Sequence, residues 1–184
     1  MDSRATPSQS PAGRYEKRTR QAGFTLIELL IVLVVLTILV TMVTPSIQRL
    51  MAQQRVSTEV LRLRNALQLA RSLAITRHTT MTICPSHDRQ VCTPEDWTAP
   101  LMIVQGPADD DTLEDEIVLR ELSASQVVSV TYRNDGRLVR FKPMGWSTGH
   151  NGTFEICGRH GEGAQVVLSN LGRIRTSGET PPDC

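Results

Sequence analysis

The stretch that decides the fold is RTRQAGFTLIELLIVLVVLTILVTMVTP, residues Arg18 to Pro45 of a 184-residue chain. Within it, the 20 residues from Phe24 to Val43 are apolar except for three threonines and one glutamate. A helix of this length rises about 30 Å, which is the thickness of the hydrocarbon core of a bilayer. We therefore expect residues 24–44 to form one helix that can cross a membrane.

The residues before the apolar run are basic and end in a small residue. Four basic side chains lie within Arg14–Arg20, and Gly23 follows them. An ordinary secretory signal has its small-residue cleavage site after the apolar part. Cleavage after Gly23 would instead remove a leader, residues 1–23, and leave the apolar helix on the mature chain. The basic side of a membrane helix stays in the cytoplasm, so the rest of the chain is expected on the other side.

One carboxylate, Glu28, interrupts the apolar run close to its start. A charged side chain inside hydrocarbon costs about 2.5–3.5 kcal/mol on insertion scales, and such residues are functional by default. The simpler alternative is that the side chain extends to the nearby headgroups. The residues around Glu28 favour a function.

The segment Gly23-Phe24-Thr25-Leu26-Ile27-Glu28 resembles the class III leader and N-terminal methylation motif of type IV pilins and pseudopilins. The resemblance implies that a prepilin peptidase cuts after Gly23 and N-methylates Phe24. It also implies an assembly role for Glu28, whose carboxylate would pair with the α-amino group of a neighbouring subunit in a filament. The implied partners are the peptidase, other major and minor pilins, and the inner membrane before assembly.

The pattern beyond Pro45 predicts that the helix continues. A proline bends a helix, and the alternative is that the helix ends there. Apolar residues then recur at alternating spacings of four and three, as one stripe of an amphipathic helix does: Val56, Val60, Leu63, Leu67, Ala70 and Ala74. We expect one helix from about Phe24 to Arg77, with a kink at Pro45 and an amphipathic part over residues 45–77. Its arginines are expected on the solvated face: Arg49, Arg55, Arg62, Arg64, Arg71 and Arg77.

Residues 78–184 are expected to form a β-rich globular domain, because alternating apolar residues and turn residues replace the helical period. The predicted strands are Thr79–Cys84, Leu101–Gln105, Glu116–Leu122, Val127–Tyr132, Arg137–Phe141, Thr153–Cys157, Gln165–Ser169 and Arg173–Thr176. Asn134-Asp135-Gly136 and Asn170-Leu171-Gly172 are predicted hairpin turns. The fold class is α+β, a long kinked N-terminal helix packed on antiparallel sheet.

Several C-terminal segments resemble the GspH/FimT-type minor pilins and pseudopilins. They are Phe141-Lys142-Pro143-Met144-Gly145, Gly152-Thr153-Phe154, Val166-Val167-Leu168-Ser169 and Gly172-Arg173-Ile174-Arg175. The resemblance implies the type IV pilin fold and a subunit of low abundance near the filament tip or priming complex.

Four cysteines follow the apolar run: Cys84, Cys92, Cys157 and Cys184. An even number beyond a membrane helix indicates two disulfides in an oxidising compartment, and sequence alone permits three connectivities. The alternative is a metal site made by Cys84, His87 and Cys92. No second cluster completes four ligands, so we expect no bound metal.

The sequence predicts neither an enzyme nor a cofactor site. The net charge is +1, and the four histidines share no metal-ligand spacing. Neither a nucleophile-elbow motif nor a phosphate loop is present. The acidic stretch Asp109–Glu116 is expected to be a solvated loop, because it lacks the glycine that an EF-hand calcium loop requires.

One basic segment is a candidate ligand site. In a strand, Arg173 and Arg175 would lie on one face about 7 Å apart, a spacing close to that of successive phosphates on one DNA strand. Arg159 and Arg137 are expected to extend this patch, as are Arg140 and Lys142. The alternative is that the arginines keep a sheet edge soluble. Some FimT-like pilins capture DNA through a basic C-terminal loop, so the resemblance implies double-stranded DNA, bound without sequence preference, as a partner in natural transformation.

The predicted function is that of a minor pilin of a type IV pilus, processed by prepilin peptidase and assembled at the pilus tip. It would cross the inner membrane once, with its C-terminal domain in the periplasm, and then move to the cell surface. The alternative is a GspH-like minor pseudopilin of a type II secretion system.

Overall fold

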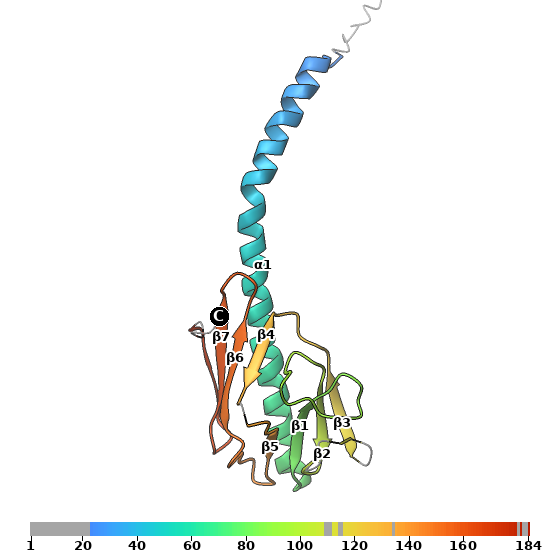
Figure 1. Ribbon diagram of the computed structural model, residues 1–184, viewed down its shortest axis with the longest axis vertical. Coiled ribbons are helices and arrows are strands. Elements are labelled where there is room, and N and C mark those ends of the chain that lie inside the picture. The colour runs from blue at the N-terminus through green and yellow to red at the C-terminus, as the bar shows by residue number, and fades with distance from the viewer. Residues whose placement is uncertain (1–22, 109–111, 114–115, 134, 180, 182–183) are drawn as a thin grey trace, which may run out of the picture. The chain divides into compact units, whose positions relative to one another are not determined.

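The structure, a computed structural model, describes residues 23–108, 112–113, 116–133, 135–179, 181 and 184 (Figure 1). The predicted leader lies outside these residues except for Gly23, and so does most of the predicted acidic loop together with Asn134. The chain divides into two compact units, Met1–Met42 and Val43–Cys184.

A single helix, α1 (Leu26–Arg77), contains 52 residues. It runs through Pro45, so the alternative that the helix ends at this proline is wrong. A proline inside a helix removes one backbone hydrogen bond, and the kink expected at Pro45 stays a prediction.

The second unit buries one stripe of α1. Of the six predicted stripe residues, Val60 is partly buried and the others are buried. Ala66 lies on the same stripe with none of its surface exposed. The period of 3.6 residues therefore identified the face of α1 that contacts the globular domain.

Eight strands follow α1 in the described part of the chain, and each overlaps a predicted strand. They are β1 (Met81–Pro85), β2 (Leu101–Gln105), β3 (Ile117–Leu122), β4 (Ser129–Tyr132), β5 (Val139–Phe141), β6 (Gly152–Cys157), β7 (Gly163–Leu168) and β8 (Ile174–Ser177). They form two four-stranded sheets with the orders β3-β2-β1-β5 and β4-β6-β7-β8, and all pairings are antiparallel. In Figure 1 both sheets lie along the C-terminal half of α1.

The connection between β4 and β5 differs from the prediction. These strands belong to different sheets, so Asp135 and Gly136 lie in a crossing segment and the predicted hairpin there is wrong. The second predicted hairpin is confirmed, because β7 and β8 pair directly. Its turn is closed by a 2.8 Å hydrogen bond from the Gly172 N–H to the Ser169 carbonyl, and Gly172 has the positive φ of 73° that favours glycine.

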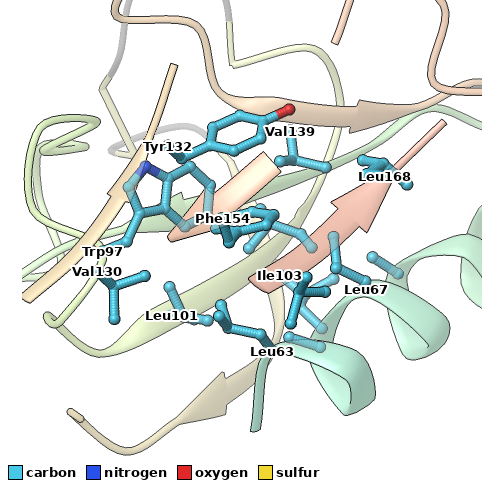
Figure 2. Packing of buried hydrophobic residues seen from close by; sticks show 14 of the residues in the cluster. Leu63, Leu67, Trp97, Leu101, Ile103, Val130, Tyr132, Val139, Phe154 and Leu168 are labelled. Atoms are coloured by element: carbon cyan, nitrogen blue, oxygen red, sulfur yellow. The ribbon is translucent and has the colours of Figure 1, made fainter. Parts of the chain in front are cut away.

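The main core lies between α1 and the two sheets (Figure 2). Leu63 and Leu67 of α1 meet Ile103 from the first sheet and Phe154 from the second, all nearly inaccessible to solvent. Trp97, from the loop between β1 and β2, packs edge-on against Phe154 at 4.9 Å between ring centroids. The core therefore joins three elements that are distant in sequence into one unit.

A buried ion pair fastens two loops to α1. The Arg62 guanidinium is 2.6 Å from the Glu59 carboxylate, and only 9% and 3% of these side chains are exposed. Arg62 also donates to the carbonyl oxygens of Trp97, Ala99 and Ser123. The expectation that all six helix arginines lie on the solvated face is therefore wrong for Arg62, because backbone carbonyls from two loops surround its guanidinium.

Two disulfides staple the second unit: Cys84–Cys92 and Cys157–Cys184. The first lies in a small apolar cluster with Met102 and Val104. The second joins the end of β6 to the C-terminal residue and closes a span of 27 residues. In the chain-entropy account, a loop of this size stabilises the folded state by about 3–4 kcal/mol. Residues 43–184 thus hold both apolar clusters, both sheets and both disulfides.

Candidate membrane, assembly and nucleic-acid sites

The start of α1 is capped by a residue of the predicted leader motif. The Thr25 hydroxyl accepts a hydrogen bond of 3.3 Å from the Glu28 N–H, and the Thr25 carbonyl accepts one of 3.2 Å from Leu29. A threonine followed three residues later by a glutamate is the capping-box pattern, and a carboxylate in the first turn also interacts favourably with the helix dipole. Glu28 thus belongs to the helix start as well as to the predicted assembly site. The capping-box pattern of Thr25 and Glu28 is visible in the sequence and could have predicted this helix start.

The predicted cleavage site is open. Gly23 precedes the helix and has no heavy atom within 4 Å of the place where a Cβ would stand. Phe24 is 86% exposed. Among the described residues, nothing therefore covers the peptide bond between Gly23 and Phe24.

Every residue from Phe24 to Met42 is exposed, and the apolar first part of α1, which begins at Leu26, is long enough to cross a membrane. Its threonine hydroxyls are satisfied within the helix, because Thr37 donates to the Val34 carbonyl and Thr41 to the Ile38 carbonyl, each at 2.8 Å. The Glu28 carboxylate forms no ion pair or side-chain hydrogen bond with any described residue. The Glu28 carboxylate is therefore the polar group of this segment that needs a partner from another molecule.

The cysteines cannot form the alternative metal site. Cys84 and Cys92 are joined, with a Cα–Cα distance of 5.3 Å, so neither thiolate is available as a ligand. The third residue of that alternative, His87, lies 2.9 Å from the Asp96 carboxylate.

The two arginines of the basic segment lie at the β7–β8 turn. Arg175 is an exposed residue of β8 and pairs in register with Val167. Arg173 is exposed too, but β8 begins only at Ile174, so Arg173 belongs to the turn and not to the predicted strand. Neither guanidinium forms an ion pair within the described part of the chain.

Arg159 does not join this segment. It lies in the turn between β6 and β7, whereas Arg173 follows the other end of β7. The six residues of β7 separate the two positions by about 20 Å. The expectation that Arg159 extends the patch around Arg173 is therefore wrong, because the antiparallel pairing places their turns at opposite ends of the sheet.

Arg137 is engaged by neighbours in the crossing segment between β4 and β5. Its guanidinium donates to the Gly149 carbonyl at 3.3 Å and lies 3.6 Å from the Asp135 carboxylate. The hydrogen bond from Arg133 is the main cause that lowers the pKa of Asp135 to about 2, so this carboxylate stays ionised at neutral pH. The charge of Arg137 is partly neutralised, and Arg137 is less available to an anion than Arg173 or Arg175.

Two glycines bring the C-terminal motifs together. A Cβ on Gly172 would lie 2.1 Å from the Gly145 carbonyl oxygen, and one on Gly145 would lie 2.8 Å from the Ile75 side chain. Both positions also approach the Arg71 Nε at 3.1 Å. The turn Lys142–Gly145 and the turn Ser169–Arg173 thus form one junction against the last part of α1, with Arg71 between them.

Comparison with family models gives two matches. The model described as "Type II transport protein GspH" matches residues 59–172. The model of the prokaryotic N-terminal methylation motif matches residues 18–44. The first match ends at Gly172, so Arg173 and Arg175 lie beyond it. No curated protein matches the chain.

The structure resembles two crystal structures of the type IV minor pilin FimU of Pseudomonas aeruginosa strain PAO1. The P21 form is 22% identical with a TM-score of 0.54, covering 70% of this chain and 94% of FimU. The P65 form is 23% identical with a TM-score of 0.51, covering 68% and 97%. At this identity the likeness shows the fold alone. The predicted α+β fold, a long N-terminal helix with antiparallel sheets as in type IV pilins, is confirmed.

Proposed function

Since this chain belongs to the GspH family of pilin-like transport proteins, we propose that it is a minor pilin of a type IV pilus, assembled at the pilus tip or priming complex. In this proposal a prepilin peptidase cleaves after Gly23 and N-methylates Phe24. Other major and minor pilins are its partners in the filament, and its role is structural and not enzymatic.

The observation that carries the proposal is the exposed apolar segment from Phe24 to Met42, in which the Glu28 carboxylate has no partner among the described residues. A helical segment whose apolar side chains are not buried by the described residues needs lipid or neighbouring helices around it. Glu28 has no partner in lipid, and a neighbour's α-amino group in a filament would supply one. The match to the methylation motif over residues 18–44 supports the same processing and assembly.

We propose that the chain first crosses the inner membrane once, with residues after the apolar helix in the periplasm. The basic residues before Gly23 support this orientation through the positive-inside rule. The two disulfides support it as well, because such bonds persist in an oxidising compartment. After assembly the second unit would lie at the cell surface.

Deletion of the gene tests the filament role. We expect cells without the protein to carry few or no pili, because a priming subunit is needed to start a filament, and piliation to return with a plasmid copy. Electron microscopy of the cells and immunoblots of sheared pili measure this.

The family description favours a second candidate, a GspH-like pseudopilin of a type II secretion system. Normal pili together with loss of protein secretion would favour that candidate over the pilus.

The second part of the proposal is that Arg173 and Arg175 bind double-stranded DNA for natural transformation. Both guanidiniums are exposed at the β7–β8 turn, and neither is neutralised by a described carboxylate. Arginine forks bind phosphate groups well, and backbone contacts carry no sequence preference. The expectation is therefore kept as a proposal for these two residues, and Arg159 is removed from the patch.

We expect the full-length protein in neutral detergent to bind a labelled duplex with an affinity that falls steeply as salt rises. Arg173→Ala with Arg175→Ala should lower the affinity about tenfold or more, because two phosphate contacts are lost. The matched control is Arg55→Ala with Arg159→Ala, which removes the same charge from a cavity at the other end of the sheet and should change binding little. Fluorescence anisotropy measures the affinity of both double variants for the duplex. Equal losses of affinity would contradict a site at the β7–β8 turn.

A further inference from the structure

A crevice of about 430 Å³ lies between α1 and the β7–β8 turn. Five of its lining residues come from α1 at the spacings of one helix face: Gln68, Arg71, Ser72, Ile75 and Thr76. The turn contributes Arg173, whose guanidinium is the second in the crevice after that of Arg71. No described carboxylate lines the crevice. The crevice therefore combines two positive charges with polar side chains and no described negative one.

The guanidinium of Arg71 is partly buried and lacks, among the described residues, the partners that a buried arginine usually has. Its Nε is buried without a hydrogen-bond partner, and the guanidinium forms no ion pair within the described part of the chain. The absent side chains of Gly145 and Gly172 let it lie against the two turns. The Arg71 Nε is thus covered by the two turns, and the positive charge of the guanidinium is not neutralised by a described carboxylate.

The polar residues of the crevice differ in what they can donate. The Thr76 hydroxyl already donates to the carbonyls of Ser72 and Leu73. The Ser72 hydroxyl and the Gln68 amide form no side-chain hydrogen bond with a described residue. Two guanidiniums, one hydroxyl and one amide are donors that suit a phosphate oxyanion. The negative end of the helix dipole opposes an anion, but it acts mainly within the last turn, and Arg71 lies six residues before the end of α1.

We propose that this crevice is an oxyanion site for a phosphate group, bound by Arg71 and Arg173. With DNA as ligand, which rests on the proposed function, one backbone phosphate occupies the crevice and a neighbouring one contacts Arg175. Arg71 then fixes the position of the DNA strand, because Arg71 belongs to the rigid helix α1 whereas Arg173 belongs to a turn. The volume exceeds that of a single phosphate and leaves room for the adjoining sugar.

The test has two arms, both with the full-length protein in neutral detergent. In the first, fluorescence anisotropy with a labelled duplex over a salt series compares wild type with Arg71→Gln, Arg71→Lys and the control Arg55→Gln. We expect Arg71→Gln to bind about tenfold more weakly and to lower the slope of log affinity against log salt by about one. Arg71→Lys should keep the slope and lose part of the affinity, because it keeps the charge but not the fork. Arg55→Gln should match wild type.

The second arm observes the wild-type protein and uses a variant of Arg71 only to assign the signal. NMR of the ¹⁵N-arginine-labelled wild type during addition of inorganic phosphate should shift an Nε–H signal, with sodium chloride at equal ionic strength as the control. The signal is assigned by its absence from Arg71→Lys, which lacks the Nε–H group.

The outcomes separate this inference from the proposed function. Duplex binding that is equally strong and equally salt-dependent in Arg71→Gln and wild type would overturn the inference and leave DNA binding in place. Wild type that binds no duplex would overturn DNA binding, and the phosphate arm alone would then decide. A shift of the Arg71 signal supports the oxyanion site, and an unchanged signal overturns it. If Arg71→Gln unfolds, Arg71→Lys and the phosphate arm still give a result.

Discussion

Glu28→Ala is expected to leave the protein in the membrane and out of the pilus. The variant should insert and be cleaved after Gly23, since removing a charge from the apolar helix makes insertion easier. Its share in filaments should fall at least about a hundredfold, because loss of one partner from an ion pair inside packed helices costs about 3–5 kcal/mol. Immunoblots of sheared pili and of membranes measure the ratio, and the size of the membrane form reports cleavage.

Two further variants separate the charge of Glu28 from its place at the helix start. Glu28→Gln keeps a side chain that can serve in a capping box but has no charge, so it should fail like Glu28→Ala. Thr25→Ala removes the hydroxyl that accepts from the Glu28 N–H and keeps the carboxylate, so it should still enter filaments. Normal incorporation of Glu28→Ala would mean that the carboxylate only reaches the headgroups. Rescue by glutamine would assign the effect to hydrogen bonding.

Arg62→Ala is expected to lower the free energy of unfolding of the second unit by about 4 kcal/mol. The change leaves the Glu59 carboxylate, in a residue only 2% exposed, without its counter-ion. It also removes the donor from the carbonyls of Trp97, Ala99 and Ser123, and the part-buried acceptors of Trp97 and Ala99 add to the loss. Urea denaturation of residues 43–184, followed by circular dichroism, measures the difference.

Matched variants define what Arg62 contributes. Arg55→Ala removes an exposed arginine from the same helix and should change stability by less than about 0.5 kcal/mol. Glu59→Gln combined with Arg62→Met removes both charges and should recover part of the loss, because a buried pair can often be replaced by uncharged residues at small cost. A loss below 1 kcal/mol for Arg62→Ala would show that water reaches the pair and replaces its hydrogen bonds.

Local patterns in the sequence could predict most of the elements. The stripe from Val56 to Ala74 depends only on the helical period, and each strand follows from alternation and nearby turn residues. The leader motif was recognisable for the same reason, since the order of basic residues, Gly23 and apolar residues is written along the chain.

Pairing between distant elements could not be predicted in this way. The crossing between β4 and β5 resembles a hairpin locally, because Asp135 and Gly136 suit a turn, but the partner of each strand lies elsewhere in the chain. The burial of Arg62 depends on carbonyls from two loops that follow it by 35 residues or more. Arg71 belongs to the candidate site for a similar reason, since only the fold brings it beside Arg173.

The junction of Gly145 and Gly172 makes the two turns around Arg71 one transferable piece. The Gly172 position admits no side chain because the neighbouring carbonyl comes from the other turn. Moving the segment Gly172–Arg175 alone onto another pilin would place its arginines without the surface that supports them. A working graft has to carry the turn Lys142–Gly145 and an arginine at the position of Arg71 as well.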